Sequence, residues 1–431
     1  MQSTTELAQK IKKLIVSEML PHISQGDITP GTLEQILRTT LQEAGQASYG
    51  ALLTAMDEQR YDVEIACPEK GAGKRISRRK AKALSIFGWI TYRRSYYRCS
   101  QGGYRIPLDE AEGLRPGEAT PLMSSLLGLA GVTTSFEEAQ RYIARVLQVR
   151  VSANTIRQET HRIGRRQQEE EKAMIRRSED LEALQKREQG LVKRPKRRYG
   201  SIDGVFILTK EGWREVKVGA WYEAGPRYGQ KELHAKNIAY YSSLEKAEEF
   251  GKLAWGTAVH HQVDQAEELI FVADGAAWIW KLVEQYFPQA VQIVDWYHAV
   301  EYLHHVAEVF PGDEAEREAW LEDTKTLLWE GEVERVLAKV EALPASLGRP
   351  REALLSYYRH NAQRMRYDEF REHNYLIGSG TIESACKQVA TLRLKRPGAQ
   401  WTETGAELTA KARSAWLSGT WSTLTGQPLA A

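Results

Sequence analysis

The sequence predicts an α/β core in which helices cover a mixed sheet. Tyr199–Leu208 is an apolar run interrupted by one aspartate, and Trp213–Tyr222 shows the period-2 alternation of a half-buried strand, so that the two form a predicted hairpin. A third short strand is predicted at Ile238–Tyr241. Further on, two apolar strands, one ending on Asp274 and one just before Asp295, alternate with segments of helical spacing. Three antiparallel strands joined to a strand–helix–strand unit make a mixed sheet with helices on its faces.

Two aspartates within this sheet are candidates for chemistry. Asp203 interrupts the first strand, and Asp274 stands at the C-terminal end of a later one. The predicted strand order brings both to neighbouring central strands, where their carboxylates can point to one place. A carboxylate near low-dielectric surroundings needs a compensating charge, and Mg²⁺ or Mn²⁺ accepts such hard ligands while keeping positions for water and phosphate. Either Asp-Gly pair taken alone is more typical of a solvated turn.

Four motifs stand in order along the chain: SIDG at residues 201–204, VADG at 272–275, VDWYHAVEYL at 294–303 and GSGTIESACK at 378–387. Together they resemble the RNase H-like DDE transposases, in the insertion-sequence and Mutator-like branch that carries a D-x-x-H pair. Within that branch the chain most resembles the ISKra group of bacterial insertion-sequence transposases. The resemblance covers most of the chain and implies an RNase H-like core with a mixed five-stranded sheet.

By the same resemblance, Asp203, Asp274 and Glu383 would form the catalytic triad and hold two Mg²⁺ or Mn²⁺ ions. Asp295 and His298 would be an accessory pair, although hydrogen bonding across the strand-to-helix junction is an equal alternative for them. In the implied reaction, water cleaves the ends of the element and the freed 3′ hydroxyl is transferred into target DNA. The partners would be double-stranded DNA, as terminal inverted repeats and as target, and further copies of the chain in a homodimer or higher homo-oligomer.

Three alternatives remain open from the residues alone. Glu383 and Lys387 have the spacing of an ordinary i,i+4 surface pair. The chain could be a catalytically inactive or domesticated DNA-binding protein on the same fold. Paired carboxylates also serve metal-free hydrolases such as glycosidases, and dependence of any activity on a metal ion would separate these from a transposase.

The composition limits the class of protein. A chain of 431 residues is long enough for roughly two to four domains and a sizeable core. The formal net charge is only +2, so a nucleic-acid-binding face must come from local clusters of basic residues. Three cysteines argue against a disulfide framework, and no apolar run is long enough to cross a bilayer. We therefore expect a soluble intracellular protein without a membrane partner, and the resemblance implies a bacterial one that is cytoplasmic and nucleoid-associated.

Changes in composition and sequence pattern divide the chain into seven segments. They are an N-terminal helical region (1–58), a β region (59–115), a helix-turn-helix region (116–165), a charged helical connector with a basic linker (166–198), the first part of the core (199–299), a helical insertion (300–372), and the final core helix with Glu383 and a C-terminal tail (373–431).

The β region carries two cysteines, Cys67 and Cys99. Transposases of the type that this chain resembles often have a zinc ribbon here, with paired C-x-x-C knuckles. This chain has Lys70 and Gly102 at the second position of each knuckle, and two thiolates do not make a structural zinc site. We therefore expect a degenerate ribbon that holds no zinc and is stabilised by packing. Its basic, tyrosine-rich runs suit phosphate contacts and stacking, but a solvated strand face is an equal alternative.

A helix-turn-helix is predicted within 116–165. Ser135 and Glu138 have the spacing of a capping box, and Ser152 is a second helix cap after a short turn. The helix that follows Ser152 is polar and basic along one face, which suits entry into the major groove. Its candidate DNA contacts are Asn154, Arg157, Gln158 and Arg162.

Other DNA contacts are expected near the core. The basic linker contributes Lys196, Arg197 and Arg198, and the segment after Glu383 contributes Arg393, Lys395 and Arg396. Tryptophans in a helical insertion are usually core residues, but Trp320 and Trp329 are also candidates for stacking on a base unpaired at the cleavage site.

The helix of Glu383 has a predicted apolar stripe. It consists of Ile382, Cys386, Val389 and Leu392, which makes Cys386 an ordinary core thiol.

Overall fold

The computed structural model describes residues 4–23, 28–68, 70–190, 193–226 and 232–427. These form two compact units: unit 1 comprises Met1–Ser124 and Gln140–Val151, and unit 2 comprises Ser125–Ala139 and Ser152–Ala431. The predicted C-terminal tail falls partly on residues 428–431, which lie outside the described residues. None of the described helices is long and apolar enough to cross a membrane.

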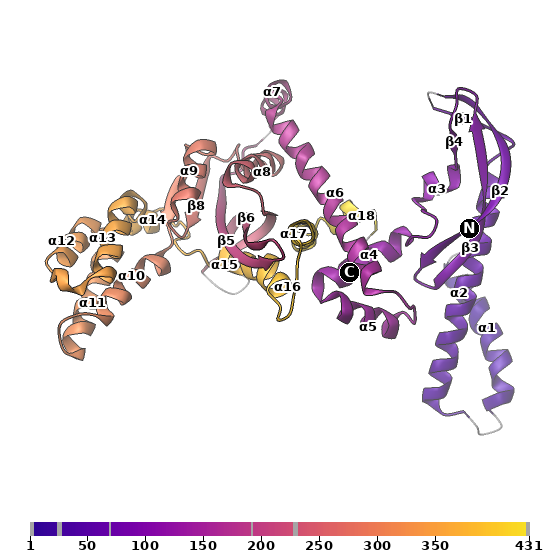
Figure 1. Cartoon of the computed structure of the whole chain (residues 1–431), viewed down its shortest axis with the longest axis horizontal. Helices are drawn as coiled ribbons and strands as arrows, with labels where there is room; N and C mark the ends of the chain where they lie inside the picture. Colours follow the sequence, from indigo (N-terminus) through magenta and orange to yellow (C-terminus); the bar gives the residue numbers. More distant parts are fainter. Residues whose placement is uncertain (1–3, 24–27, 69, 191–192, 227–231, 428–431) are drawn as a thin grey trace. The chain divides into compact units, whose positions relative to one another are not determined.

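Unit 1 combines a long helix with a four-stranded antiparallel sheet of order β1-β2-β3-β4 (Figure 1). Its elements are α1 (Thr4–Ile23), α2 (Pro30–Arg60), β1 (Glu64–Cys67), β2 (Gly71–Ser85), β3 (Gly88–Cys99), β4 (Tyr104–Arg105) and α3 (Pro107–Glu112). The buried carboxylate of Asp57 on α2 accepts hydrogen bonds from the backbone N–H (2.8 Å) and Oγ (2.6 Å) of Ser95 on β3. The helical and β regions predicted as separate segments therefore share one unit.

The two cysteines of unit 1 are joined. Cys67 at the end of β1 and Cys99 at the end of β3 form a disulfide with a Cα–Cα distance of 6.2 Å. Both strands pair with β2, where Cys67 lies opposite Gly71 and Cys99 opposite Gly73. The expectation that packing alone holds this ribbon is thus wrong, because strand pairing brings the two sulfurs together.

We expect Cys67→Ser to lower the free energy of unfolding of unit 1 by about 2–4 kcal/mol in oxidising buffer, the usual effect of a bond that closes a loop of this length. Urea unfolding followed by tyrosine and tryptophan fluorescence measures the change. In excess dithiothreitol the wild type and the variant should coincide, and a difference that persisted there would mean that the serine perturbs the packing instead.

The second part of the chain opens with helices and continues into a five-stranded sheet of order β7-β6-β5-β8-β9. The helices before the sheet are α4 (Pro121–Thr133), α5 (Phe136–Val146), α6 (Ala153–Glu179) and α7 (Leu181–Gln189). The sheet segment comprises β5 (Arg197–Thr209), β6 (Gly212–Pro226), β7 (Leu233–Ser243), α8 (Ala247–His260), β8 (Glu268–Ala273), α9 (Ala277–Tyr286) and β9 (Val291–Val294). Strands β5, β6 and β7 are antiparallel neighbours, whereas β8 is parallel to β5 and to β9. This confirms the predicted mixed sheet with helices on its faces.

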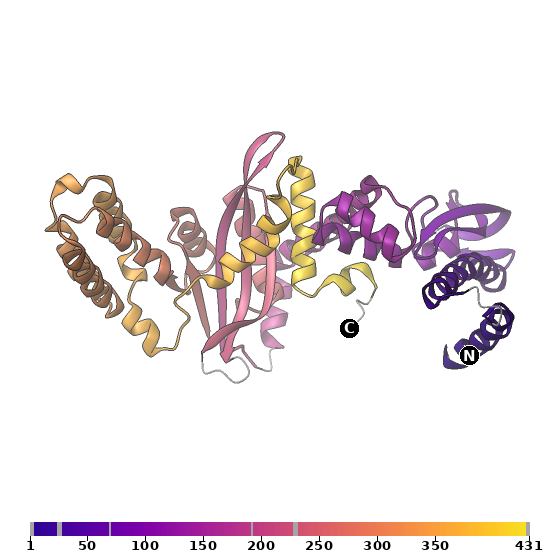
Figure 2. The same cartoon turned by 90° about the horizontal axis from the view of Figure 1, so that it is seen from below.

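Later helices complete unit 2. They are α10 (Trp296–Glu308), α11 (Glu314–Trp329), α12 (Val333–Glu341), α13 (Arg349–Asn361), α14 (Tyr367–Glu372), α15 (Gly380–Cys386), α16 (Leu392–Leu394), α17 (Glu403–Leu417) and α18 (Trp421–Thr425). Of these, α15 and α17 pack on the sheet, whereas α10 to α13 pack on one another. The predicted insertion is helical, as α10 to α14 show. The segment with α15 returns to the sheet and packs on β5 and β6, which Figure 2 shows as a yellow ribbon across the strands. The core of unit 2 runs through all of these layers.

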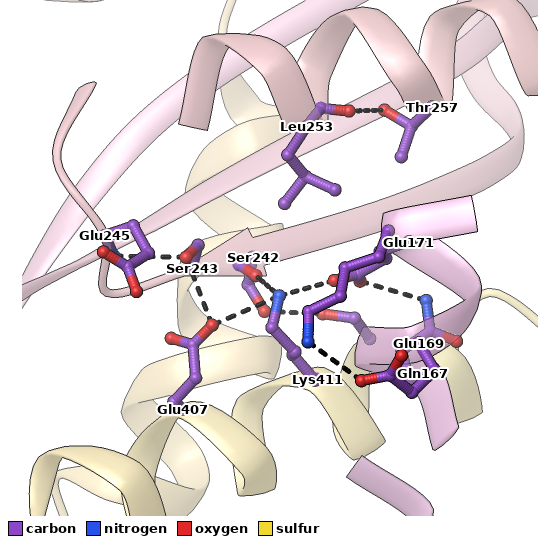
Figure 3. A network of polar contacts seen from close by, with 12 residues as sticks. Gln167, Glu169, Glu171, Ser242, Ser243, Glu245, Leu253, Thr257, Glu407 and Lys411 are labelled. Carbon is purple, nitrogen blue, oxygen red and sulfur yellow. Dashed lines mark hydrogen bonds and ion pairs between the residues drawn. The ribbon is translucent and has the colours of Figure 1, made fainter. Parts of the chain in front are cut away.

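The predicted connector is not a separate element. Helix α6 continues without a break from Ala153 to Glu179 and packs against α8 and α17. Its contact with α17 contains a buried polar network (Figure 3) beside an apolar cluster that includes Ile163 and Ala412. Lys411 of α17 forms an ion pair with Glu171 of α6, donates to the Ser242 carbonyl at 3.0 Å, and lies 3.2 Å from Glu407. The predicted connector has few apolar residues, and this network shows that some of its polar side chains are buried between helices.

Candidate active site and nucleic-acid-binding surfaces

Asp203 and Asp274 lie at the centre of the sheet. The parallel strands β5 and β8 pair from Arg197 with Glu268 to Gly200 with Phe271, an offset of 71 residues. The two aspartates have the same offset, so each follows the last paired residue of its strand by three positions. Side chains at equivalent positions of neighbouring parallel strands project from the same face of a sheet. Register therefore brings together the two carboxylates that the sequence singled out.

The surroundings of Asp203 oppose its negative charge. Burial raises the pKa of this carboxyl, and the negative charge of Asp274 raises it further. Its Oδ1 accepts from the Gly204 N–H at 2.6 Å, and its Oδ2 accepts from the Cys386 thiol at 3.4 Å. Burial together with the charges of Asp203, Asp274 and Glu383 raises the pKa of Cys386, so the thiol keeps its proton for this bond. Cys386 is buried as predicted, but it also contacts a candidate catalytic residue, which sequence patterning did not reveal.

The loop after β8 fixes Asp274. Its Oδ1 accepts from the Ala276 N–H at 2.9 Å, and its carbonyl accepts from the Tyr357 hydroxyl at 2.5 Å. Gly275 between them has φ +93, and a Cβ there would stand 2.5 Å from the Tyr357 hydroxyl oxygen. Glycine is therefore required on both counts. Tyr357 comes from α13 of the insertion and stacks on Tyr302 of α10 with ring centroids 4.1 Å apart, so the insertion supports the site.

Asp295 joins two parts of the site. Its side chain is 1% exposed; it accepts from the His298 N–H at 2.5 Å as the N-cap of α10, and from the Ser379 N–H just before α15. His298 is partly exposed, with Nδ1 3.4 Å from Glu301 Oε2, and its charge acts on the pKa of Asp203. The contacts of Asp295 match the structural alternative, since they hold the start of the Glu383 helix against α10. His298 keeps part of its ring exposed beside Glu301.

Glu383 stands in the first turn of α15 and is exposed. The Ser379 hydroxyl donates to its Oε1 at 3.3 Å. Beyond Cys386 the chain forms a π-helical turn, Lys387–Thr391, before α16. A π turn inserts an extra residue and rotates the following face, and such turns are frequent at functional sites. The predicted stripe fails at Leu392, which is 53% exposed, while Arg393 and Leu394 are buried.

The negative charges of Asp203, Asp274 and Glu383 suit a divalent cation, but the three side chains do not converge on one position. The two aspartates face each other across neighbouring strands, and a cation would remove the repulsion that raises the pKa of Asp203. In the part of the chain that the structure describes, no group of three or more His, Cys, Asp and Glu side chains is arranged to hold a metal ion. Glu383 is exposed on α15 and accepts a hydrogen bond from the Ser379 hydroxyl.

The predicted capping boxes and caps of the helical region are present. Ser135 Oγ accepts from the Glu138 N–H at 3.2 Å, Glu138 Oε2 accepts from the Ser135 N–H at 3.1 Å, and Ser152 caps α6. At the start of α6, Asn154, Arg157 and Gln158 are exposed on one face. Arg162 is partly buried and forms an ion pair with Glu159 at 2.9 Å, so it is less available than the other three.

The remaining predicted DNA contacts divide by exposure. Lys196 and Lys395 are exposed, whereas Arg197 and Arg198 already belong to β5 and form ion pairs with Glu268 and Glu223. The basic linker therefore ends earlier than its sequence predicted, because these arginines pair with acids of the neighbouring strands.

The two tryptophans of the insertion differ. Trp320 is 7% exposed and packs on Phe310 with centroids 5.4 Å apart, which leaves no face for a nucleotide base. Trp329 is 38% exposed, with Trp296 against its edge and the Arg371 guanidinium 4.0 Å over its ring. Only Trp329 keeps exposed aromatic surface.

In unit 1, strands β2 and β3 place like charges opposite each other. Lys74 faces Arg98, and Lys80 faces Arg93, all with exposed side chains. Like charges in directly opposed pairs destabilise a sheet, and an anionic partner would relieve that repulsion. This register favours the phosphate-contact interpretation of the basic runs over a plain solvated face.

Comparison with known families gives one match. Residues 31–425 match UPF0236, which is described as an uncharacterised protein family. No curated protein matches the chain.

Proposed function

We propose that this chain, which belongs to the uncharacterised protein family UPF0236, is a DNA transposase of an insertion sequence with an RNase H-like catalytic core. The observation that carries the proposal is the common register offset of Asp203 and Asp274 on neighbouring parallel strands. The sheet order β7-β6-β5-β8-β9, with three antiparallel strands and then a parallel pair, supports the same assignment. So does the return of α15, with Glu383, to β5 and β6 after a helical insertion.

Asp203, Asp274 and Glu383 would hold two Mg²⁺ or Mn²⁺ ions. Such an ion pair supplies activation of the attacking oxygen and charge stabilisation on the leaving oxygen of an in-line phosphoryl transfer. The chain positions the ligands: Tyr357 anchors the carbonyl of Asp274, and Cys386 donates to Asp203. Positioning of this kind contributes to catalysis because the site need not reorganise during the reaction.

In the proposed reaction, water attacks phosphorus at the end of the element, the P–O3′ bond breaks, and the departing O3′ takes up a proton. The new 3′ hydroxyl then attacks a phosphodiester of target DNA, so that one P–O bond forms as another breaks and the proton passes to the departing oxygen. Total bond count is conserved, and no oxidant or covalent protein intermediate is required. The partly exposed ring of His298, whose charge acts on the pKa of Asp203, would hold the water or the scissile phosphate.

The second candidate is a DNA-binding protein that has the fold but lacks catalysis. The observation that favours it is the exposed position of Glu383, away from the aspartates. Cleavage of duplex DNA taken from both flanks of the gene, with Mg²⁺ or Mn²⁺ and with chelator, separates the two candidates. Metal-dependent cleavage supports the transposase, and tight specific binding without cleavage in either metal supports the second candidate.

We expect Gln158→Ala at the start of α6 to weaken binding to the element's own end by about 1–3 kcal/mol, the value of a good base contact. Binding to unrelated duplex should not change, because the side chain is uncharged and makes no phosphate ion pair. Fluorescence anisotropy with both duplexes measures the effect. Gln185→Ala, an equally exposed glutamine on α7, is the matched control. Equal losses on both duplexes would place α6 outside the base-reading surface.

A further inference from the structure

A pocket of about 820 Å³ lies between the start of α5, the start of α6 and the segment that follows α16. Its charged lining is mostly cationic, with Arg157, Lys210, Arg393 and Arg396 against Glu137 and Glu138. Glu138 is already engaged, since it accepts from Arg396 Nη1 at 2.6 Å and from the Ser135 N–H at 3.1 Å. The pocket therefore has an excess of positive charge.

Arg393 is the unusual member of this lining. Its side chain is only 2% exposed, and its guanidinium lies 4.5 Å from the Phe136 ring centre and 4.9 Å from that of Trp401. Nε donates to the Gly131 carbonyl at 2.8 Å, whereas Nη2 is buried with no hydrogen-bond partner among the described residues. Burial and the nearby Arg413 and Arg396 lower the pKa of Arg393 to about 10. A buried donor on a cation is costly to leave unsatisfied, so an anion is the natural complement.

His161 gives a second, independent sign of a missing partner. Its Nε2 is buried and has no hydrogen-bond partner in the described part of the chain. Burial, then Arg157, Arg165 and Arg393, lower the pKa of His161 to about 4, which leaves the ring neutral near pH 7. Two donor-capable groups from different helices, Arg393 and His161, thus line the same pocket without complete partners.

We propose that this pocket holds a backbone phosphate of the DNA whose bases the start of α6 contacts. Arg157 links the two functions, because it lines the pocket and is exposed on the same face as Asn154 and Gln158. Forked arginine donors fit phosphate oxygens, and the pocket is large enough for a nucleotide, since small-molecule pockets span roughly 300–1,000 Å³. An acidic protein segment fits less well, because a carboxylate partner would not account for the neighbouring base-reading face.

The site also joins DNA binding to the catalytic segment. Arg393 follows Glu383 by a single continuous run of α15, the π turn and α16. Arg413 of α17 holds this run from the other side, donating from Nε to the Gln388 carbonyl at 2.6 Å and to the Val132 carbonyl. A phosphate seated on Arg393 would thus fix the segment that carries Glu383. This inference rests on the proposed function for the identity of the DNA.

The test is DNA binding by the full-length protein as a function of salt, with the single variants Arg157→Ala and Lys210→Ala, whose side chains are exposed and whose loss does not threaten the fold. Each should weaken binding to any duplex and reduce the slope of log K against log [salt] by about 1, the signature of one lost phosphate contact. Arg335→Ala, on α12 and outside the pocket, is the matched control and should leave the slope unchanged. Arg393→Lys keeps the charge but loses the fork and should also weaken binding.

Two further arms identify the phosphate. When a neutral methylphosphonate replaces one backbone phosphate of the duplex at a time, the wild type should bind more weakly at one position. Arg157→Ala should show no additional loss of affinity for the duplex modified at that position. Unchanged salt slopes in both pocket variants would overturn the proposal. Competition by inorganic phosphate at fixed ionic strength, without any methylphosphonate effect, would assign the pocket to free phosphate and also overturn it. Asp203→Asn should bind DNA like the wild type, so the binding assay can be interpreted even when no DNA is cleaved. The pocket proposal and the transposase proposal can therefore be refuted independently.

Discussion

Asp203→Asn is expected to reduce metal-dependent DNA cleavage by roughly 10³-fold or more, because it removes one negative ligand from a centre that works by holding charge. Asparagine keeps the size of the side chain and an acceptor for the Gly204 N–H, so the strand should be unaffected. DNA binding should be preserved, since no DNA-contact candidate touches this residue. Single-turnover cleavage of end-labelled duplex in Mg²⁺ measures the loss.

Asp62→Asn is the matched control for this prediction. Asp62 is an exposed aspartate just before β1 and belongs to unit 1, outside the candidate site. The Asp62→Asn protein should cleave DNA at the wild-type rate. Cleavage by Asp203→Asn within threefold of wild type would remove Asp203 from the catalytic centre, and equal losses in both variants would point to an artefact of the assay.

Lys411→Met should lower the free energy of unfolding by about 3–5 kcal/mol, the usual cost of removing one member of a buried ion pair. Burial alone would lower the pKa of Lys411, but the facing carboxylates of Glu171 and Glu407 raise it, so the side chain is charged when folded. Without it, Glu171 keeps only Gln167 Nε2, at 3.0 Å, as a partner in the network of Figure 3. Glu407 retains the Leu244 N–H at 2.6 Å and the Ser243 hydroxyl at 3.1 Å.

Chemical unfolding followed by circular dichroism measures this change. Lys281→Met, an exposed lysine on α9, should cost less than about 0.5 kcal/mol and serves as control. The double variant Lys411→Met with Glu171→Met should recover much of the loss, because it leaves no unpaired carboxylate on α6. A double variant less stable than Lys411→Met alone would mean that Glu171 is stabilised by contacts other than the lysine.

Local sequence patterns were sufficient to predict the sheet and to locate its two aspartates. An apolar run identified β5 and alternation identified β6, and the two Asp-Gly motifs gave the positions that register brings together. Caps were equally predictable, since the bonds of Ser135 and Ser152 reach only three residues along the chain. Each of these features depends on residues close in sequence or on the order of the strands, and both can be inferred from the sequence pattern.

Features that depend on distant partners were not predictable. Cys386 contacts Asp203 across 183 residues, and Lys411 meets Glu171 across 240. Charge suggested only a connector for α6 and gave no sign that Arg393 is buried, because nothing local indicates that a distant chain segment covers these side chains. The predicted apolar stripe also misplaced its last member, since position 393 and not 392 continues the period of about 3.6 residues from Ile382.

The most direct test of the central claim is to map the DNA ends that the wild-type protein makes. Duplexes spanning each flank of the gene are incubated with the protein and Mg²⁺ or Mn²⁺, and the products are sequenced and tested for extension by a polymerase. The account predicts metal-dependent cuts at one defined position per flank that leave extendable 3′ hydroxyls, some of them joined to new target DNA. Specific binding without any cut in either metal would contradict it and leave a DNA-binding protein on this fold.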